Sequence, residues 1–162
     1  MSDYLKTGYL NASDLEFPDE SVIKQHFVAV TECVQEIPCN PCVESCPVSA
    51  IKMEGINGIP HIDFEKCIGC GNCVAVCPGL AMFLVNIKEG KGRVSLPYEM
   101  LPLPNKGDTV NLLDRKGEKV GIGTVIGIRR IEKDTTSSII TVELDDTSLI
   151  KVVRNIEVIK SE

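Results

Sequence analysis

The sequence predicts an α+β chain in which a cysteine-rich domain built from two similar halves precedes a small all-β barrel. Three observations support this prediction. All eight cysteines lie between Cys33 and Cys77, a 31-residue repeat runs through the same segment, and Val, Ile and Thr alternate with other residue types near the C-terminus. We therefore divide the chain into an N-terminal arm (1–26), a cysteine-rich domain (27–97) and a barrel domain (98–162).

The composition is that of a folded globular protein. Of the 162 residues, 43% are hydrophobic and 25% are charged, which excludes a disordered or collagen-like chain. Aromatic residues make up only 4% and Trp is absent, so large aromatic side chains cannot dominate the core. No apolar stretch approaches the roughly 20 residues of a membrane-spanning helix, and the first residues do not resemble a secretory signal. We expect a cytoplasmic protein that does not bind membranes.

The negative charge is concentrated in the half that contains the cysteines. Residues 1–97 carry 7 Lys and Arg against 12 Asp and Glu, a net charge of −5, whereas residues 98–162 have a net charge of only −1. An acidic surface repels phosphate backbones and attracts basic protein surfaces. The charge therefore argues against nucleic acid and for a protein partner.

The repeat aligns the cysteines of the two halves. The pairs are Cys39 with Cys70, Cys42 with Cys73, Cys46 with Cys77, Pro47 with Pro78 and Ala50 with Ala81. Each half is predicted to contain a short strand, a cysteine loop, a turn of helix and a second strand. The expected strands are 28–30 and 50–53 in the first half, and 61–63 and 81–85 in the second. The sequence thus predicts a pseudo-twofold pair of β-α-β units.

The sequence also predicts the structure of the segments on either side of the repeat. Residues 1–26 show no periodicity, so we expect an extended arm on a neighbouring surface, and residues 93–96 are expected to add a strand after the turn at 90–92. Beyond residue 98, the alternation predicts four or five strands that close into an SH3-like barrel. The residues expected to share faces are Val110 and Leu112; Val120, Ile122, Ile126 and Ile128; Ile140, Val142 and Leu144; and Ile150 and Val152.

The second cysteine motif has the spacing C-x2-C-x2-C-x3-C-P, from Cys67 to Pro78. Three thiolates spaced by three residues surround one iron–sulfur cube, and the fourth, which precedes proline, ligates the other cube. Soft thiolates are the ligands that iron–sulfur clusters prefer. Gly69 and Gly71 leave room for backbone N–H groups to approach the sulfurs.

On these residues, segment 27–87 resembles a bacterial-type dicluster ferredoxin domain. The resemblance implies a ferredoxin-like pseudo-twofold fold that holds two 4Fe-4S clusters. Carried over by motif, it assigns Cys67, Cys70, Cys73 and Cys46 to one cluster, and Cys39, Cys42 and Cys77 to the other. The chain is also similar to the small iron–sulfur subunit of flavin-dependent dehydrogenase complexes, which implies a flavoprotein redox partner.

The eighth ligand departs from the family pattern. The repeat places Glu36 where the second half has Cys67, and the remaining cysteine, Cys33, lies three residues earlier. A longer loop costs little extra closure entropy, so we expect Cys33 to be the fourth ligand of the first cluster. Glu36 is the alternative ligand, and a three-iron cluster with an empty position is a third possibility.

Other interpretations of the cysteines stay open at this point. Eight thiols can form two zinc sites, although zinc ligands usually come as separate C-x2-C pairs. Disulfides are a further alternative, disfavoured in a reducing compartment.

Because a fully ligated cluster offers no open iron, we expect an electron-transfer protein or non-catalytic oxidoreductase subunit without a small-molecule substrate of its own. The alternatives are a free-standing ferredoxin and a metal-stabilised binding or regulatory module.

Overall fold

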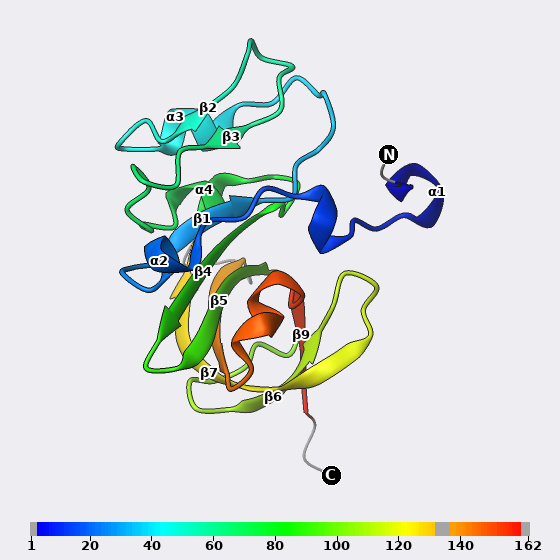
Figure 1. Ribbon diagram of the computed structural model, residues 1–162. Coiled ribbons are helices and arrows are strands. Elements are labelled where there is room, and N and C mark those ends of the chain that lie inside the picture. The colour runs from blue at the N-terminus through cyan, green and yellow to red at the C-terminus, as the bar shows by residue number, and fades with distance from the viewer. Residues whose placement is uncertain (1–2, 132–136, 160–162) are drawn as a thin grey trace.

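The computed structural model describes residues 3–131 and 137–159, and its main feature is one large antiparallel sheet. Seven strands follow one another in the order β1-β4-β5-β8-β7-β6-β9 (Figure 1). Their bounds are β1 Val28–Thr31, β4 Met82–Lys88, β5 Lys91–Tyr98, β6 Thr109–Leu113, β7 Lys119–Arg130, β8 Ser138–Leu144 and β9 Asn155–Val158. The chain is therefore mixed, with a dominant sheet and short helices.

The sheet continues across the expected boundary at residue 98. Strand β5 pairs with β4 on one side and with β8 on the other, so that Val94 lies opposite both Val85 and Val142. The closed SH3-like barrel expected for 98–162 is not confirmed, because the described strands form an open sheet that ends at β1 and β9. The physical reason is that β5, which comes from the cysteine half, supplies the neighbour that β8 needs.

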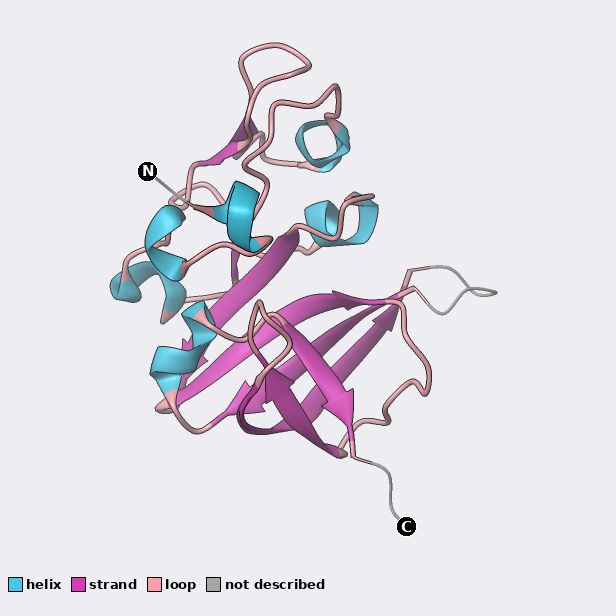
Figure 2. Ribbon diagram, turned by 90° about the vertical axis from the view of Figure 1, so that its right-hand side faces the viewer, coloured by secondary structure: helices cyan, strands magenta, loops and turns pink. Residues whose placement is uncertain are grey.

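The cysteine half has the expected internal symmetry. Helix α3 spans Pro41–Ser45 and α4 spans Asn72–Val76, 31 residues later. Both are followed by a residue with a φ of 52°, Ser49 in the first half and Leu80 in the second. Strand β1 pairs with β4, and β2 (Ile51–Lys52) pairs with β3 (His61–Ile62), so each half lends a strand to the other. Figure 2 shows the strands of the large sheet at one end of the molecule and most of the short helices toward the other.

The N-terminal arm consists of short helical turns joined by irregular segments. These turns are α1 (Tyr4–Thr7), η1 (Ala12–Asp14) and α2 (Glu20–Ile23). Helix α2 buries Val22 and Ile23, and the Asn86 side chain donates to the Ile23 carbonyl at 2.7 Å. Lys116 lies 5.0 Å from the centre of the Tyr9 ring, so the arm also contacts the C-terminal half.

The sheet supplies most of the core. Val85, Val94, Leu96, Val125 and Ile140 have no more than 5% of their surface exposed, and they lie on strands from both halves of the chain. The short helix η2 (Thr147–Lys151) adds Ile150 to the same cluster. Among the described residues, no helix is long and apolar enough to cross a membrane.

Candidate metal centre

Four cysteines of the second predicted set surround one cavity. Cys46, Cys67, Cys70 and Cys73 line it together with Val48 and Ile68. Cys67 and Cys73 are buried, Cys46 is half-buried and Cys70 is exposed. The structure thus brings together the residues that the repeat and the motif had placed in one ligand set, with the opening of the site at Cys70.

The loop from Cys67 to Cys73 is shaped by glycine and by its neighbours. Gly69 has a φ of +67°, and a Cβ at this position would lie 2.2 Å from the Phe27 carbonyl oxygen. This close approach holds the loop against the residue that precedes β1. The backbone N–H of Ala29, in β1, donates to Cys67 Sγ at 3.3 Å. Gly69 is therefore required by packing as well as by its conformation.

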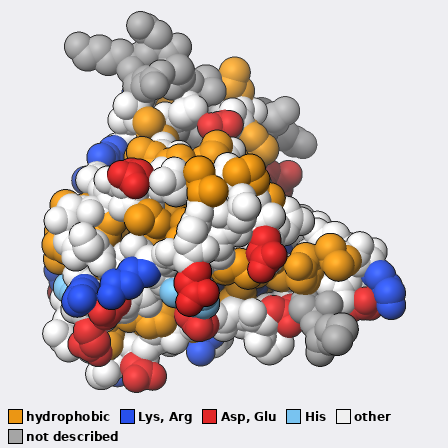
Figure 3. All heavy atoms as spheres, turned by 90° about the horizontal axis from the view of Figure 1, so that it is seen from above, with side chains coloured by type: hydrophobic (Ala, Val, Ile, Leu, Met, Phe, Trp, Pro, Cys, Tyr) orange, Lys and Arg blue, Asp and Glu red, His pale blue; other side chains and the backbone are white. Residues whose placement is uncertain are grey.

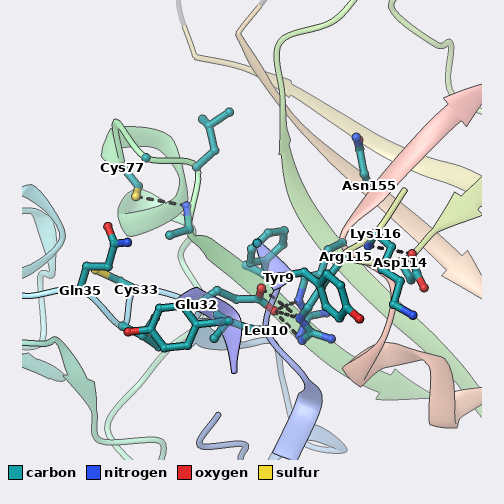
Figure 4. A pocket seen from close by; sticks show the side chains of 18 of the residues that line it. Tyr9, Leu10, Glu32, Cys33, Gln35, Cys77, Asp114, Arg115, Lys116 and Asn155 are labelled. Carbon is teal, nitrogen blue, oxygen red and sulfur yellow. Dashed lines mark hydrogen bonds and ion pairs between the residues drawn. The ribbon is translucent and has the colours of Figure 1, made fainter. Parts of the chain in front are cut away.

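The first predicted set lies at a second site. Cys33, Cys39 and Cys77 line a cavity of about 620 Å³ between the cysteine loops, the arm and the C-terminal half (Figure 4). Burial raises the pKa of the Cys42 thiol, and the charges of Cys77, Cys33 and Cys39 add to this rise. Cys42 is not among the residues that line this cavity, and the motif alone assigns it to the set.

Matching hydrogen bonds to sulfur mark the two halves of the repeat. The Ala50 N–H donates to Cys46 Sγ at 3.2 Å, and the Ala81 N–H donates to Cys77 Sγ at 3.4 Å. Each is an i to i+4 contact, and the two pairs are 31 residues apart. Donors directed at sulfur stabilise the negative charge that a cluster and its thiolates carry.

The two cysteine sets are close enough to interact electrostatically. Burial raises the pKa of the Cys73 thiol to about 12, and the charges of Cys67, Cys70 and Cys42 act in the same direction. Cys42 belongs to the other set, so the two sites are neighbours. Because thiolates are the ligand form, metal binding must displace the protons that burial favours, and folding and cluster binding are coupled.

The structure places Glu36 and Cys33 differently. Cys33 lines the first cavity, whereas Glu36 is exposed and is absent from the cavity lining even though Gln35 and Ile37 belong to it. The Cys33 N–H donates to Thr31 Oγ1 at 3.1 Å, which fixes the loop as it leaves β1. This arrangement favours Cys33 as the donor.

The residues present fit two iron–sulfur clusters. All eight cysteines are free, so the disulfide alternative is not found. The donors are instead soft thiols in two groups of four, with backbone N–H groups directed at three of the sulfurs.

Several residues near the two sites were not predicted from the sequence. Glu32 accepts hydrogen bonds from the guanidinium groups of Arg115 and Arg154, and Arg129 donates to the Cys70 carbonyl at 3.0 Å. All three arginines belong to the C-terminal half. No sequence motif marks them, because their partners lie 59 to 122 residues away in the chain.

Comparison with known proteins identifies the cysteine segment. The family model of the 4Fe-4S dicluster domain matches residues 32–81, which include all eight cysteines. No solved structure matches the chain.

Curated relatives match the chain over part of their length. The polyferredoxin-like subunit of aliphatic sulfonate oxidoreductase from Pyrococcus furiosus is 44% identical over 62 residues, which are 38% of this chain and 34% of that protein. Protein NrfC of Escherichia coli is 33% identical over 120 residues, 65% of this chain and 50% of the relative. The thiosulfate reductase electron transfer subunit PhsB of Salmonella typhi is 43% identical over 53 residues, 33% of this chain and 27% of the relative. The chain thus spans half or less of these proteins.

Proposed function

We propose that this chain, in which residues 32–81 are a 4Fe-4S dicluster domain, is the electron-transfer subunit of an oxidoreductase complex. When bound, a 4Fe-4S cluster takes up and releases one electron at a time. The chain itself holds two such clusters, keeps their sulfurs fixed and presents one of them to a partner. It contributes no catalytic residue of its own.

We assign the first cluster to Cys33, Cys39, Cys42 and Cys77, and the second to Cys46, Cys67, Cys70 and Cys73. The observation that supports this proposal is that Cys46 lines one cavity with Cys67, Cys70 and Cys73, whereas Cys77 lines another with Cys33 and Cys39, so that each comes from the opposite half of the repeat. Crossed ligands keep the two sites adjacent.

The second site has the features of a docking surface for a protein. Ile68 and Val48 line its cavity with 53% and 36% of their surfaces exposed. Seen from above, the end of the molecule that carries the cysteine loops presents hydrophobic side chains with carboxylates among them (Figure 3). Residues 33–81 contain five Asp and Glu against two Lys and no Arg. An apolar patch with an acidic surround suits a partner whose own patch is surrounded by Lys and Arg.

The proposed partner is a flavoprotein. A flavin releases two electrons one at a time, and two adjacent one-electron sites can receive them in turn. The names of the relatives support a multi-subunit oxidoreductase, since two of them are described as subunits. We further propose that the chain works in the cytoplasm, where a reducing environment keeps eight free thiols available for iron.

Purification under strictly oxygen-free conditions tests this function. The expected product is a brown protein with about eight iron and eight sulfide per chain that dithionite bleaches. Stoichiometric zinc, or no metal after such handling, would refute the cluster proposal and favour a metal-stabilised binding module.

Oxygen-free co-purification from the source organism separates the two electron-transfer alternatives. A flavin-containing protein that elutes with the chain at fixed stoichiometry supports the subunit proposal. Elution of the iron-loaded chain alone supports a free-standing ferredoxin. An Ile68→Glu variant is expected to weaken the complex, whereas Ile122→Glu is the matched control, since Ile122 is equally exposed but lies on β7.

A further inference from the structure

A group of three charged residues with little exposed surface lines the same cavity as the cysteines of the first proposed cluster site. Glu32 immediately precedes Cys33, and its carboxylate accepts hydrogen bonds from Arg115 Nε at 2.9 Å, from Arg115 Nη2 at 2.5 Å and from Arg154 Nε. We propose that this Glu32–Arg115–Arg154 triad positions the first cluster site and raises its reduction potential through a buried net positive charge. This inference rests on the proposed ligand set.

The triad is removed from solvent. The side chains of Glu32, Arg115 and Arg154 are only 13%, 10% and 6% exposed. Arg154 also donates to the carbonyls of Ile150 and Val153 and lies 5.0 Å from the centre of the Phe83 ring. Arginine stays protonated at neutral pH, so one carboxylate faces two guanidinium groups. The triad therefore has a net charge of +1 that water screens poorly.

Backbone hydrogen bonds connect the triad to the site. The Glu32 N–H donates to the Ala81 carbonyl at 2.8 Å, and the Ala81 N–H donates to Cys77 Sγ at 3.4 Å. Glu32 is thus adjacent to Cys33 in the chain and is connected to Cys77 through two hydrogen bonds by way of Ala81. Both cysteines belong to the first set. Figure 4 shows the Glu32 carboxylate between Cys33 and the Arg115 guanidinium.

The net charge of the triad is expected to change the reduction potential of a cluster at this site. Reduction adds one negative charge to a cluster, and a nearby buried positive charge stabilises the reduced form. Among the described residues, the second site has no such buried triad: Arg129, which donates to the Cys70 carbonyl, is exposed. The second cluster therefore serves as an internal reference within the same molecule.

A series of charge variants in the full-length, iron-loaded chain tests the proposal. Arg115→Met lowers the net charge of the triad to 0, and Glu32→Gln raises it to +2. The expected result is that the reduction equilibrium of one cluster falls about tenfold in the first variant, about 59 mV for a one-electron couple, and rises in the second. EPR-monitored redox titration measures both potentials, and the second cluster should move much less.

Two further variants make the test decisive. The double variant Glu32→Gln/Arg115→Met restores a net charge of +1 and is expected to return the potential to the wild-type value. Arg93→Met is the matched control. Arg93 pairs with Glu143 at 2.8 Å, and the two side chains are only 21% and 20% exposed. Arg93 lies on β5 opposite Asn86, four residues along β4 from Met82. It should leave both potentials unchanged.

A purely structural triad gives a different pattern. It predicts loss of thermal stability in every variant and no shifts of opposite sign. Equal potentials in all iron-loaded variants, equal shifts of both clusters, or a double variant that stays shifted would overturn the proposal. If one single variant fails to load iron, the presence or absence of the expected shift in the other single variant decides the question. A wild-type chain without clusters would instead refute the proposed function itself.

Discussion

Replacing Gly69 by Ala should destabilise the second cysteine loop by more than any other glycine substitution near it. Gly69 has a φ of +67°, a conformation that costs an L-residue about 1–2 kcal/mol. The new Cβ would also lie 2.2 Å from the Phe27 carbonyl oxygen and 2.7 Å from Phe27 Cβ, and relieving such overpacking costs about 1–3 kcal/mol. The expected total, about 2–5 kcal/mol, corresponds to a fall in melting temperature of roughly 5–15 °C.

Two neighbouring glycines separate the causes of this loss. Gly71 has a φ of +80°, but its Cβ would meet nothing closer than 3.4 Å, so Gly71→Ala should cost only the backbone strain, about 1–2 kcal/mol. Gly79 has an unstrained φ and nothing within 4 Å, so Gly79→Ala should change stability by no more than about 0.5 kcal/mol.

Thermal unfolding of the iron-loaded variants in the absence of oxygen measures the series. Loss of the visible absorbance reports cluster release, and all four proteins are heated at the same rate because the transition is expected to be irreversible. The order expected is Gly79→Ala equal to wild type, then Gly71→Ala, then Gly69→Ala. A Gly69→Ala protein as stable as Gly71→Ala would show that the contact with Phe27 does not determine the loop, and the packing argument would be wrong.

Three further predictions concern the ligands, the core and a surface carboxylate. Cys33→Ala should lose iron from one cluster while Glu36→Ala keeps about eight iron per chain, as measured by iron analysis and EPR; the opposite result would make Glu36 the ligand. Leu112→Ala should lower the free energy of unfolding by about 2–5 kcal/mol, because Leu112 is fully buried, and a calorimetric change below this range would contradict the packing. Ser148→Ala should raise the pKa of Asp146, which hydrogen bonds from the Ser148 hydroxyl and N–H now hold below its usual 3.8. A lowered carboxyl pKa stabilises the fold at pH values above the pKa of the unfolded state, and this stabilisation is lost as the pH falls through the folded-state pKa. An NMR titration should therefore find a higher Asp146 pKa in the variant, and its stability should depend less on acid.

The repeat in the cysteine half could be predicted because ligand chemistry fixes spacing. The offset that aligns Cys39 with Cys70 also relates α3 to α4, and Ser49 to Leu80, in the structure. Each cysteine sulfur must reach an iron of its cluster, which restricts the spacing within a motif. The longer interval between Cys33 and Cys39 departs from this spacing, and its extra residues lie in a loop that lines the first cavity.

The faces of the C-terminal strands were predicted only where alternation is undisturbed. Leu112 and Val142 are fully buried, as expected. Ile122 was expected to share a face with Ile126, but its side chain is 57% exposed and β7 has a register shift between Val125 and Gly127. A bulge adds a residue on one strand and reverses which side chains face the core. Its position depends on the neighbouring strand, which the local pattern does not reveal.

The 3-10 helix η2 was a further difference from expectation. Ile150 and Val152 were expected on a strand, but they lie in and just after this helix. Ile150 is buried, Val152 is half-buried and Val153 is fully buried. The Asp146 side chain accepts from the Ser148 N–H at 2.9 Å and begins the helix. Such local hydrogen bonds compete with strand pairing. The alternation of hydrophobic residues alone does not reveal them.

The contacts between the two halves explain why the cysteine-rich half and the C-terminal strands share one sheet. The hairpin of β4 and β5 begins one residue after Ala81, whose backbone donates to Cys77 Sγ, and ends in strand pairing with β8. Hydrogen bonds also fix the C-terminal half to both cysteine loops. Arg129 donates to the Cys70 carbonyl, and Arg115 donates to the Glu32 carboxylate. Electron transfer favours sites that rearrange little on reduction. A sheet that crosses from one half to the other supplies that rigidity where a short cysteine-rich domain with few aromatic residues has little core of its own.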